Sequence, residues 1–510
     1  MDGNSHRGSR IARNTLMLYV RMLVLMLVGL YTSRVVLEAL GENDFGIYSV
    51  VGGVVAMFTI ISGALNSAVQ RFITFEMGKG KDAQLNKVYS TAVTIQLILA
   101  VIIVILAEPA GIWFIRNEMT ISPDRIPAAE WVLHFSLLSF VINLMSVPQM
   151  ASITAHEKMS AYAWIGILDG LLRLGTALLI MHSGGERLIQ YAALMAGTVL
   201  IVRAAYGIYC RRHFEECRYR PVFDRKLMKE MFSFAGWNFI GVTSSVLRDH
   251  GGNILVNLFS GTTVNAARGV ALQLNGAVQG FVTNFMTAVN PQITKSYAAG
   301  DFSYMHSLVM KSSKLSFCLL FFIALPVLMN TDFLLGVWLD EVPLHTSLFV
   351  RLFLILTLSE SLSNPMITSI LATGDIRNYQ LLVGGLVLLN LPVSYVFMRY
   401  GAFPEVTVIV AIVISQICLF ARLYMLKKAM DFPVMRFMKE VYLNVIFKVV
   451  AASAVLPLVV ELYKPAGFSG FCISCAVCFV SVAVCVYMFG LTRDERGWIV
   501  NLLKTRRDGK

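Results

Sequence analysis

The sequence predicts an all-α, polytopic membrane protein with about 14 transmembrane helices, arranged as two pseudo-symmetric six-helix bundles plus two C-terminal helices. Composition is the first observation: 56% of the 510 residues are hydrophobic and only 15% are charged, whereas soluble chains carry about 25% charged residues. The second is a series of apolar runs, each close to the roughly 20 residues that a helix needs to cross a hydrocarbon core. The third is an internal repeat with a period of 220 residues.

Fourteen apolar runs fill most of the chain. The seventh and eighth carry several polar residues and are the least apolar. The first run is long enough to span the bilayer and lacks a convincing cleavage site, so we expect it to stay in the membrane as a signal anchor. The runs lie near residues 15–38, 45–69, 87–108, 129–150, 160–182, 188–210, 232–258, 264–289, 313–335, 346–372, 378–398, 404–426, 440–462 and 468–490.

The distribution of basic residues predicts the orientation. A cytoplasmic N-terminus leaves only five of the 43 Lys and Arg residues in external loops, which is the asymmetry of the positive-inside rule. Both termini are then cytoplasmic. The net charge of +12 follows from this topology and from anionic headgroups, so it does not indicate nucleic acid. The five external residues are Arg116, Arg125, Arg187, Arg399 and Lys464.

A shift of 220 positions aligns residues 41–80 with 261–300 without a gap. Because six spans separate the two segments, both halves share one orientation, as in transporters with parallel repeats. We therefore predict an N-terminal bundle over 1–210, a basic cytoplasmic linker over 211–231, a C-terminal bundle over 232–430, and two extra helices with a tail over 431–510. Seven positions are identical: Gly41 and Gly261, Val50 and Val270, Ala68 and Ala288, Val69 and Val289, Ile73 and Ile293, Thr74 and Thr294, and Gly80 and Gly300.

Motifs for enzymatic chemistry are missing from the sequence. It contains no G-x-x-x-x-G-K-[ST] loop and no G-x-S-x-G elbow, and His156-Glu157 lacks the second histidine of a zinc motif. Cys472, Cys475 and Cys478 form C-x-x-C-x-x-C inside an apolar helix, where small packing residues are a better interpretation than metal ligands. We expect no enzyme, no cofactor and no metal site.

Charged residues inside the spans are the strongest functional indicators, because charge in the hydrocarbon region is costly. Asp169 and Arg173 are four residues apart and can pair along one helix face, as can Arg34 and Glu38. Other basic residues lie near helix ends and can simply reach the interface: Arg34, Arg268 and Arg351 on the external side, and Arg203 and Lys448 on the cytoplasmic side. Arg21 and Arg248 lie deeper.

Polar residues recur at helical spacing in matching spans of the two halves. Span 2 carries Tyr48, Thr59, Ser62, Asn66 and Gln70 on one face, and span 8 carries Arg268, Asn275, Gln279, Thr283, Thr287 and Asn290. Such stripes can be hydrogen bonds between helices in a tight bundle. Their recurrence in both halves favours a polar cavity shared by the two bundles.

Arginine exceeds acid among these residues, so we expect the cavity to suit an anion such as phosphate or pyrophosphate. Asp249 and Glu360 are possible sites for coupling to H⁺ or Na⁺, because intramembrane acids are functional candidates. The predicted anion-binding set is Arg21, Arg248, Arg268, Asn66, Gln70, Asn275, Gln279 and Asn290.

Several motifs resemble those of the Wzx-type polysaccharide and O-antigen flippases of the multidrug/oligosaccharidyl-lipid/polysaccharide (MOP) exporter superfamily. The resemblance covers nearly the whole chain. In the first half it rests on N-T-L-M-L-Y at 14–19, S-R-V-V-L-E-A-L-G at 33–41, D-F-G-I-Y at 44–48 and Q-R-F at 70–72. In the second half it rests on N-A-A-R-G at 265–269 and N-P-Q-I at 290–293.

This resemblance implies two six-helix bundles with two extra helices in a bacterial inner membrane. They move an oligosaccharide on undecaprenyl pyrophosphate from the cytoplasmic to the periplasmic leaflet by alternating access. The glycan would serve O-antigen, lipopolysaccharide, capsule or another surface polysaccharide. The MATE-like (multidrug and toxin extrusion) branch of the superfamily, which exports cationic drugs with ion coupling, is the alternative that Glu360 and Asp249 keep open. A scaffold of an envelope assembly has no positive feature here.

Overall fold

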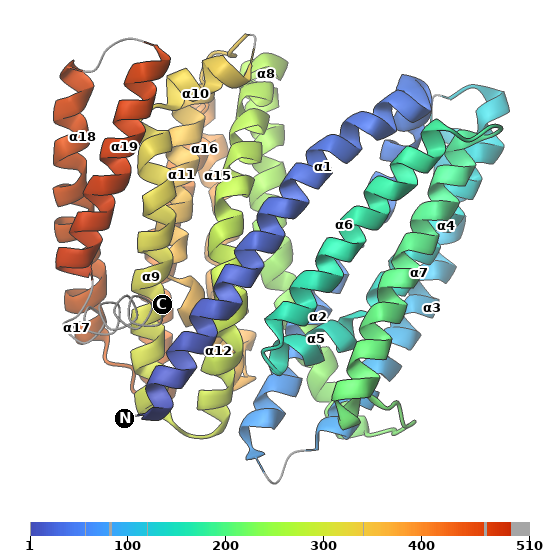
Figure 1. The fold of residues 1–510 in the computed structure, drawn as a ribbon, viewed down its shortest axis with the longest axis horizontal. Helices are drawn as coiled ribbons and strands as arrows, with labels where there is room; N and C mark the ends of the chain where they lie inside the picture. The colour runs from blue at the N-terminus through green and yellow to red at the C-terminus, as the bar shows by residue number, and fades with distance from the viewer. Residues whose placement is uncertain are drawn as a thin grey trace, which may run out of the picture. The chain divides into compact units, whose positions relative to one another are not determined.

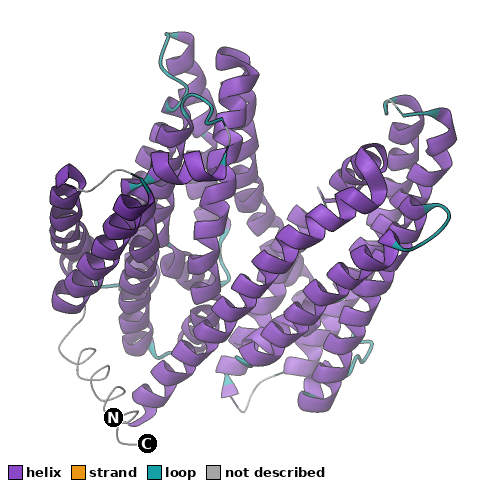
Figure 2. Ribbon diagram, turned by 45° about the horizontal axis from the view of Figure 1, so that its top comes forward, coloured by secondary structure: helices purple, strands orange, loops and turns teal. Residues whose placement is uncertain are grey.

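The computed structural model describes residues 2–56, 58–80, 84–119, 121–339, 341–463 and 467–490, and all regular structure in these ranges is helical (Figures 1 and 2). The first eight α-helices are α1 Asp2–Ala56, α2 Thr59–Gly78, α3 Leu85–Asn117, α4 Ile126–Leu144, α5 Val147–Ala155, α6 Met159–Met181, α7 Arg187–His213 and α8 Arg225–Ala298. The remaining α-helices are α9 Phe302–Met329, α10 Thr331–Trp338, α11 Thr346–Ser361, α12 Asn364–Thr373, α13 Arg377–Tyr379, α14 Gly385–Leu388, α15 Asn390–Arg399, α16 Val406–Met430, α17 Val434–Phe437, α18 Ala451–Tyr463 and α19 Phe468–Cys485. Short 3-10 turns (η2 Pro123–Arg125, η3 Glu215–Cys217) and π-helical segments (η4 Gln380–Gly384, η5 Met438–Val450, η6 Val486–Gly490) complete the described chain.

Helix length and hydropathy confirm a polytopic membrane protein. Ten helices in the described residues are long and apolar enough to cross a bilayer, and an eleventh forms if α11 and α12, bent by 43°, are one span. The other three predicted runs, 45–69, 232–258 and 264–289, are also helical but more polar. These three runs contain the polar stripes and several of the predicted site residues. The polar residues that lower their mean hydropathy therefore include residues predicted to bind the substrate.

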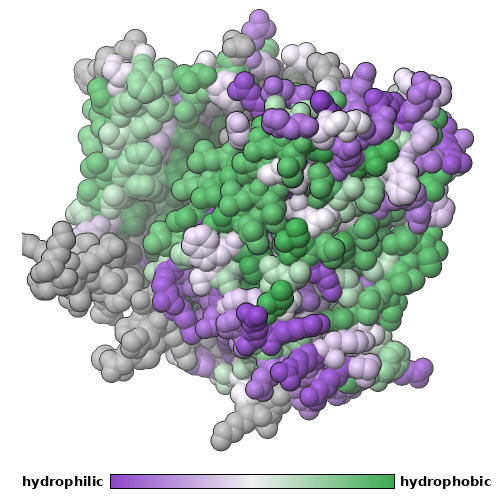
Figure 3. Space-filling view, turned by 45° about the vertical axis from the view of Figure 1, so that its right-hand side comes forward, coloured by the Kyte–Doolittle hydropathy of each residue, from purple (hydrophilic) through white to green (hydrophobic). Residues whose placement is uncertain are grey.

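One face of α3 shows why these helices need lipid. Leu97, Val101 and Ile105 follow one another at four-residue spacing and are all exposed, whereas Ala100, Ile103 and Ala107 are buried. In water such a face would be unfavourable, while in a bilayer it contacts acyl chains. Figure 3 shows hydrophobic side chains gathered in a band, with hydrophilic side chains on either side of it.

Two glycines break the longest helices. Gly41 in α1 has φ 76° and ψ 169°, and Gly261 in α8 has φ 83° and ψ 180°. Only glycine adopts this backbone region readily. Each break separates two helical arms and turns the chain between consecutive predicted spans.

The order of elements repeats in the two halves. Gly41 and Gly261, and likewise Gly80 and Gly300, share a positive φ at the aligned positions. The break between α4 and α5 is followed by Pro148, and the break between α11 and α12 by Pro365. The helical pattern thus supports the repeat far more firmly than seven identical residues do.

The described residues form two compact units. Unit 1 comprises those of 1–242 and 287–300, and unit 2 those of 243–286 and 301–510, so α8 contributes to both. The domain boundaries that the sequence suggests at 211–231 and 431 stay a prediction.

Unit 1 is built around α1, which packs along α6, while α4 packs along α7. Val36, Ile180 and Tyr191 form part of a buried core of α1, α6 and α7, and Tyr191 contacts the ring of Tyr48 with centroids 4.9 Å apart. The polar stripe of span 2 therefore begins within this core.

Unit 2 contains the two C-terminal helices. Phe322 of α9 packs on Phe479 of α19 with ring centroids 4.8 Å apart, and Asn330 donates to Ser474 Oγ at 3.0 Å. Ser481 of α19 donates to the Ser453 carbonyl of α18 at 2.8 Å. These helices are therefore tied to unit 2 by packing and by buried hydrogen bonds.

Candidate functional site

The predicted site residues divide between the two units. Unit 1 holds Arg21, Asn66, Gln70 and Asn290, and unit 2 holds Arg248, Arg268, Asn275, Gln279, Asp249 and Glu360. In unit 2 the structure brings both arginines and both acids into one connected cluster.

Arg248, on the first arm of α8, is the centre of that cluster. Its Nη1 donates to Glu360 Oε1 of α11 at 2.7 Å, and its Nε donates to Asp249 Oδ1 at 3.0 Å. The Arg248 side chain is 16% exposed, and those of Glu360 and Asp249 are 30% and 41% exposed. The two acids that the sequence leaves without partners are therefore both paired with one arginine.

Arg268, on the second arm of α8, is 3% exposed and is held by neutral groups. Its Nε donates to Asn253 Oδ1 at 2.8 Å and its Nη2 to the Asp249 carbonyl oxygen at 3.1 Å. The guanidinium also lies 5.1 Å from the ring centroid of Phe353. Its Nη1 is buried and has no hydrogen-bond partner among the described residues.

Glycine provides the space for this arginine. A Cβ at Gly252 would lie 2.4 Å from Arg268 Nη2, so any larger residue there displaces the guanidinium. Arg21 in unit 1 has the same arrangement: a Cβ at Gly166 would lie 2.2 Å from its Nε. The Arg21 guanidinium lies 4.4 Å from the Tyr162 ring centroid, and its Nε is buried without a partner among the described residues.

The amides of the stripes have different environments. Asn275 Oδ1 accepts a hydrogen bond from Thr357 Oγ1 at 2.7 Å, which joins α8 to α11. This contact agrees with the alternative in which the stripes hold helices together. Gln279 is exposed, and Asn66, Gln70 and Asn290 are half-buried.

A second charged cluster, in unit 1, is absent from the sequence prediction. Glu157 lies in the turn between α5 and α6, and its side chain is 2% exposed. One carboxylate oxygen contacts Lys295 Nζ at 2.8 Å, and the other contacts Arg10 Nε at 2.8 Å and Gln292 Nε2 at 2.7 Å. The Glu157 carbonyl accepts from Asn14 Nδ2 at 3.2 Å.

Polar contacts outside the spans hold the helix ends. Asp224 accepts from the Lys226 and Leu227 amides at the start of α8 and from Lys87 Nζ at 2.6 Å. The hydrogen bond from Lys87 is the main reason that the pKa of Asp224 falls to about 2. Burial opposes ionisation of Glu216, but the 2.5 Å hydrogen bond to His156 keeps its pKa below the ordinary value.

The described residues thus contain ten or eleven apolar spans, a repeated helical order and charged clusters within the helices. The chain belongs to the family described as polysaccharide biosynthesis protein, whose pattern it matches over residues 11–297. It shares its fold with solved MATE transporters. The predicted recognition and fold class are thereby confirmed.

Similar proteins agree with this assignment. The uncharacterized membrane protein EpsK of Bacillus subtilis (strain 168) is 19% identical over 300 residues, which cover 58% of this chain and 59% of that relative. A MATE in complex with MaD3S superposes with a TM-score of 0.72 at 13% identity, covering 83% of this chain and 97% of that chain.

Two further solved structures share the fold. One is an outward-facing multidrug resistance MATE family transporter of the MOP superfamily, with a TM-score of 0.68 at 12% identity. The other is a MOP superfamily transporter from Pyrococcus furiosus Vc1 (DSM3638), with a TM-score of 0.65 at 12% identity. Both cover 84% of this chain and 97% of their own length.

Proposed function

We propose that the protein moves an oligosaccharide linked to undecaprenyl pyrophosphate from the cytoplasmic to the periplasmic leaflet by alternating access. The family supplies the polysaccharide context. The proposal rests on Arg268, a buried cation whose side chain contacts no carboxylate among the described residues. Burying an uncompensated charge is expensive, so such a group inside a span is a functional candidate.

The charges around Arg268 favour an anion. Both neighbouring carboxylates contact Arg248, and within the described part of the chain Arg268 contacts an amide oxygen, a backbone carbonyl and an aromatic ring. A pyrophosphate presents several oxygens that can accept from a guanidinium fork. The free Nη1 of Arg268 is the donor that we assign to it.

The same contacts argue against export of cationic drugs. A cation would need a free carboxylate, whereas Asp249 and Glu360 both already contact Arg248. Coupling to H⁺ or Na⁺ is a separate proposal: protonation of Glu360 would release Arg248 Nη1 for the substrate. The inner membrane location and the cytoplasmic termini are likewise proposals.

Substitution of Arg268 tests the anion site. In cells that lack the chromosomal copy, Arg268→Met should reduce transport of the lipid-linked glycan by roughly tenfold or more, because a charge-assisted hydrogen bond is lost. Arg268→Lys should retain part of it. The measurement is the amount of lipid-linked glycan that accumulates facing the cytoplasm, normalised to protein abundance.

Arg351→Met is the matched control. Arg351 also lies in unit 2, but its side chain is 41% exposed and contacts Asp332, which is 71% exposed. This variant should transport like the parent. Arg268→Met protein made in normal amounts and transporting at the parental rate would refute the anion site.

A further inference from the structure

A cavity in unit 1 lies outside the cluster assigned to transport. It has a volume of about 480 Å³ and is enclosed by α3, α7, the junction of α4 and α5, and the segment after η3. This size is in the range of small-molecule pockets, about 300–1,000 Å³. Tyr219 closes one side, where its hydroxyl lies 3.3 Å from Thr94 Oγ1 of α3.

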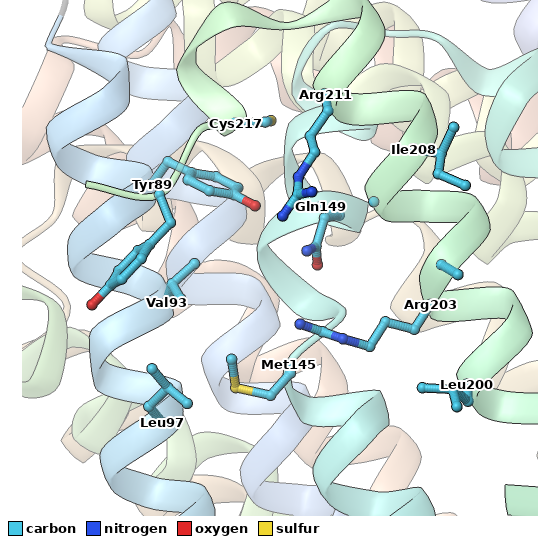
Figure 4. A pocket seen from close by; sticks show the side chains of 13 residues that line it. Tyr89, Val93, Leu97, Met145, Gln149, Leu200, Arg203, Ile208, Arg211 and Cys217 are labelled. Atoms are coloured by element: carbon cyan, nitrogen blue, oxygen red, sulfur yellow. The ribbon is translucent and has the colours of Figure 1, made fainter. Parts of the chain in front are cut away.

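Two arginines of one helix face provide the charge of this cavity. Arg203 and Arg211 are two turns apart on α7, which is about 12 Å along the axis, and Gly207 lies between them. A Cβ at Gly207 would meet nothing within 4 Å, so the space between the arginines is open. Figure 4 shows both side chains extending from α7 toward Gln149, on either side of it.

The lining has no counter-charge. None of its residues is acidic, and Arg203 Nη1 is buried without a hydrogen-bond partner among the described residues. Glu216, next in sequence to the lining residue Cys217, is bound to His156. Among the described residues that line the cavity, the two arginines therefore have no carboxylate to balance them.

The rest of the lining is suited to hydrocarbon. Leu97 of α3 and Leu200 and Ile208 of α7 line the cavity and are 43%, 56% and 54% exposed. Because both helices are membrane spans, these exposed side chains contact acyl chains. An occupant must therefore be anionic at one end and apolar at the other.

We propose that this cavity binds the headgroup of an anionic glycerophospholipid, with its phosphate between Arg203 and Arg211 and its acyl chains along Leu97, Leu200 and Ile208. Basic pockets between transmembrane helices bind such headgroups in other membrane proteins. The site would couple the stability of unit 1 to the anionic lipid content of the membrane. It does not depend on the transported substrate.

Native mass spectrometry of the purified full chain tests the proposal. The parent should retain phosphatidylglycerol or cardiolipin and not phosphatidylcholine. Arg203→Gln with Arg211→Gln should lower the occupancy of anionic lipid by roughly tenfold or more, since each substitution removes a charge-assisted contact. Arg211→Gln alone, at an exposed position, tests the site even if the double variant is made poorly.

Arg212→Gln is the matched control, because Arg212 is the exposed neighbour of Arg211 and does not line the cavity. It should bind lipid like the parent. Equal occupancy in the parent and in both Arg211 variants would overturn the proposal. So would loss of undecaprenyl pyrophosphate binding in those variants with phosphatidylglycerol unchanged, which would assign the cavity to the carrier lipid.

Discussion

Glu157 joins three distant segments of unit 1 through one buried carboxylate. Arg10 belongs to α1, and Gln292 and Lys295 to the last turns of α8. The residue adopts φ 58°, a left-handed conformation that is uncommon outside glycine. This conformation directs the side chain into the unit, and the surrounding contacts offset its cost.

Glu157→Gln should therefore destabilise the protein. The neutral amide no longer balances Arg10 and Lys295, and Gln292 Nε2 loses its charged acceptor, so the expected loss is about 1–3 kcal/mol. Thermal unfolding in detergent, followed by tryptophan fluorescence, measures it. Glu186→Gln is the control: Glu186 is 64% exposed in its pair with Arg125, so its loss should stay within about 0.5 kcal/mol. Equal losses of stability in the Glu157→Gln and Glu186→Gln variants would show that the buried contacts of Glu157 do not stabilise the protein.

Only some of these ion pairs can be predicted from the sequence. Asp169 and Arg173 pair at 2.9 Å as predicted, because one helix turn determines their distance. Arg248 and Glu360 are 112 residues apart in sequence. Helical periodicity shows which residues share one face of a helix, but it does not show which other helix packs against that face, so this pair could not be predicted. Glu157 lies in a turn, where no periodicity marks a buried residue.

At the scale of elements, the glycine breaks determine where two long helices turn. Gly41 and Gly261 have no atom within 4 Å of a hypothetical Cβ. The requirement for glycine at these positions is therefore conformational and not steric. Their alignment in the sequence repeat predicts an equivalent role, and the backbone angles agree.

Gly41→Ala and Gly261→Ala should each cost about 1–3 kcal/mol, the usual penalty for this backbone region in a non-glycine residue. Gly46→Ala and Gly269→Ala are the controls, since both glycines lie in helical arms of the same helices with open space around the Cβ position. Alanine favours the helix interior there, by about 0.5–1 kcal/mol. Thermal unfolding of the four variants measures these changes in stability. Equal effects at all four positions would contradict a conformational role for the breaks.

Element boundaries inside the spans are harder to predict. The apolar runs over 129–150 and 346–372 each contain two helices, α4 with α5 and α11 with α12. Pro148 and Pro365 lie in the first turn of the second helix of each pair, and hydropathy alone does not register a break of two residues. The bend of 43° between α11 and α12 lies directly before Pro365, which cannot continue the hydrogen bonds of α11.

At the scale of the molecule, the fold class follows from composition, run length and repeat, because the bilayer restricts the chain to a few architectures. The three least apolar helices have the run length of a span but carry more polar residues than the others. The division of the predicted site between two units, and the burial of Arg268 among neutral groups, depend on tertiary packing that no single-helix pattern encodes.

We propose that the protein flips a pyrophosphate-linked glycan and that the Arg268 cluster binds the pyrophosphate. The most direct test is purified protein in liposomes that contain a lipid-linked oligosaccharide with a fluorescent label, with a membrane-impermeant quencher added outside. The parent protein should make the internally oriented label accessible to the quencher. Arg268→Met should do so at a rate at least roughly tenfold lower, and Arg351→Met should match the parent. Equal rates in protein-free liposomes and with the parent protein, or undiminished flipping by Arg268→Met, would contradict the proposal.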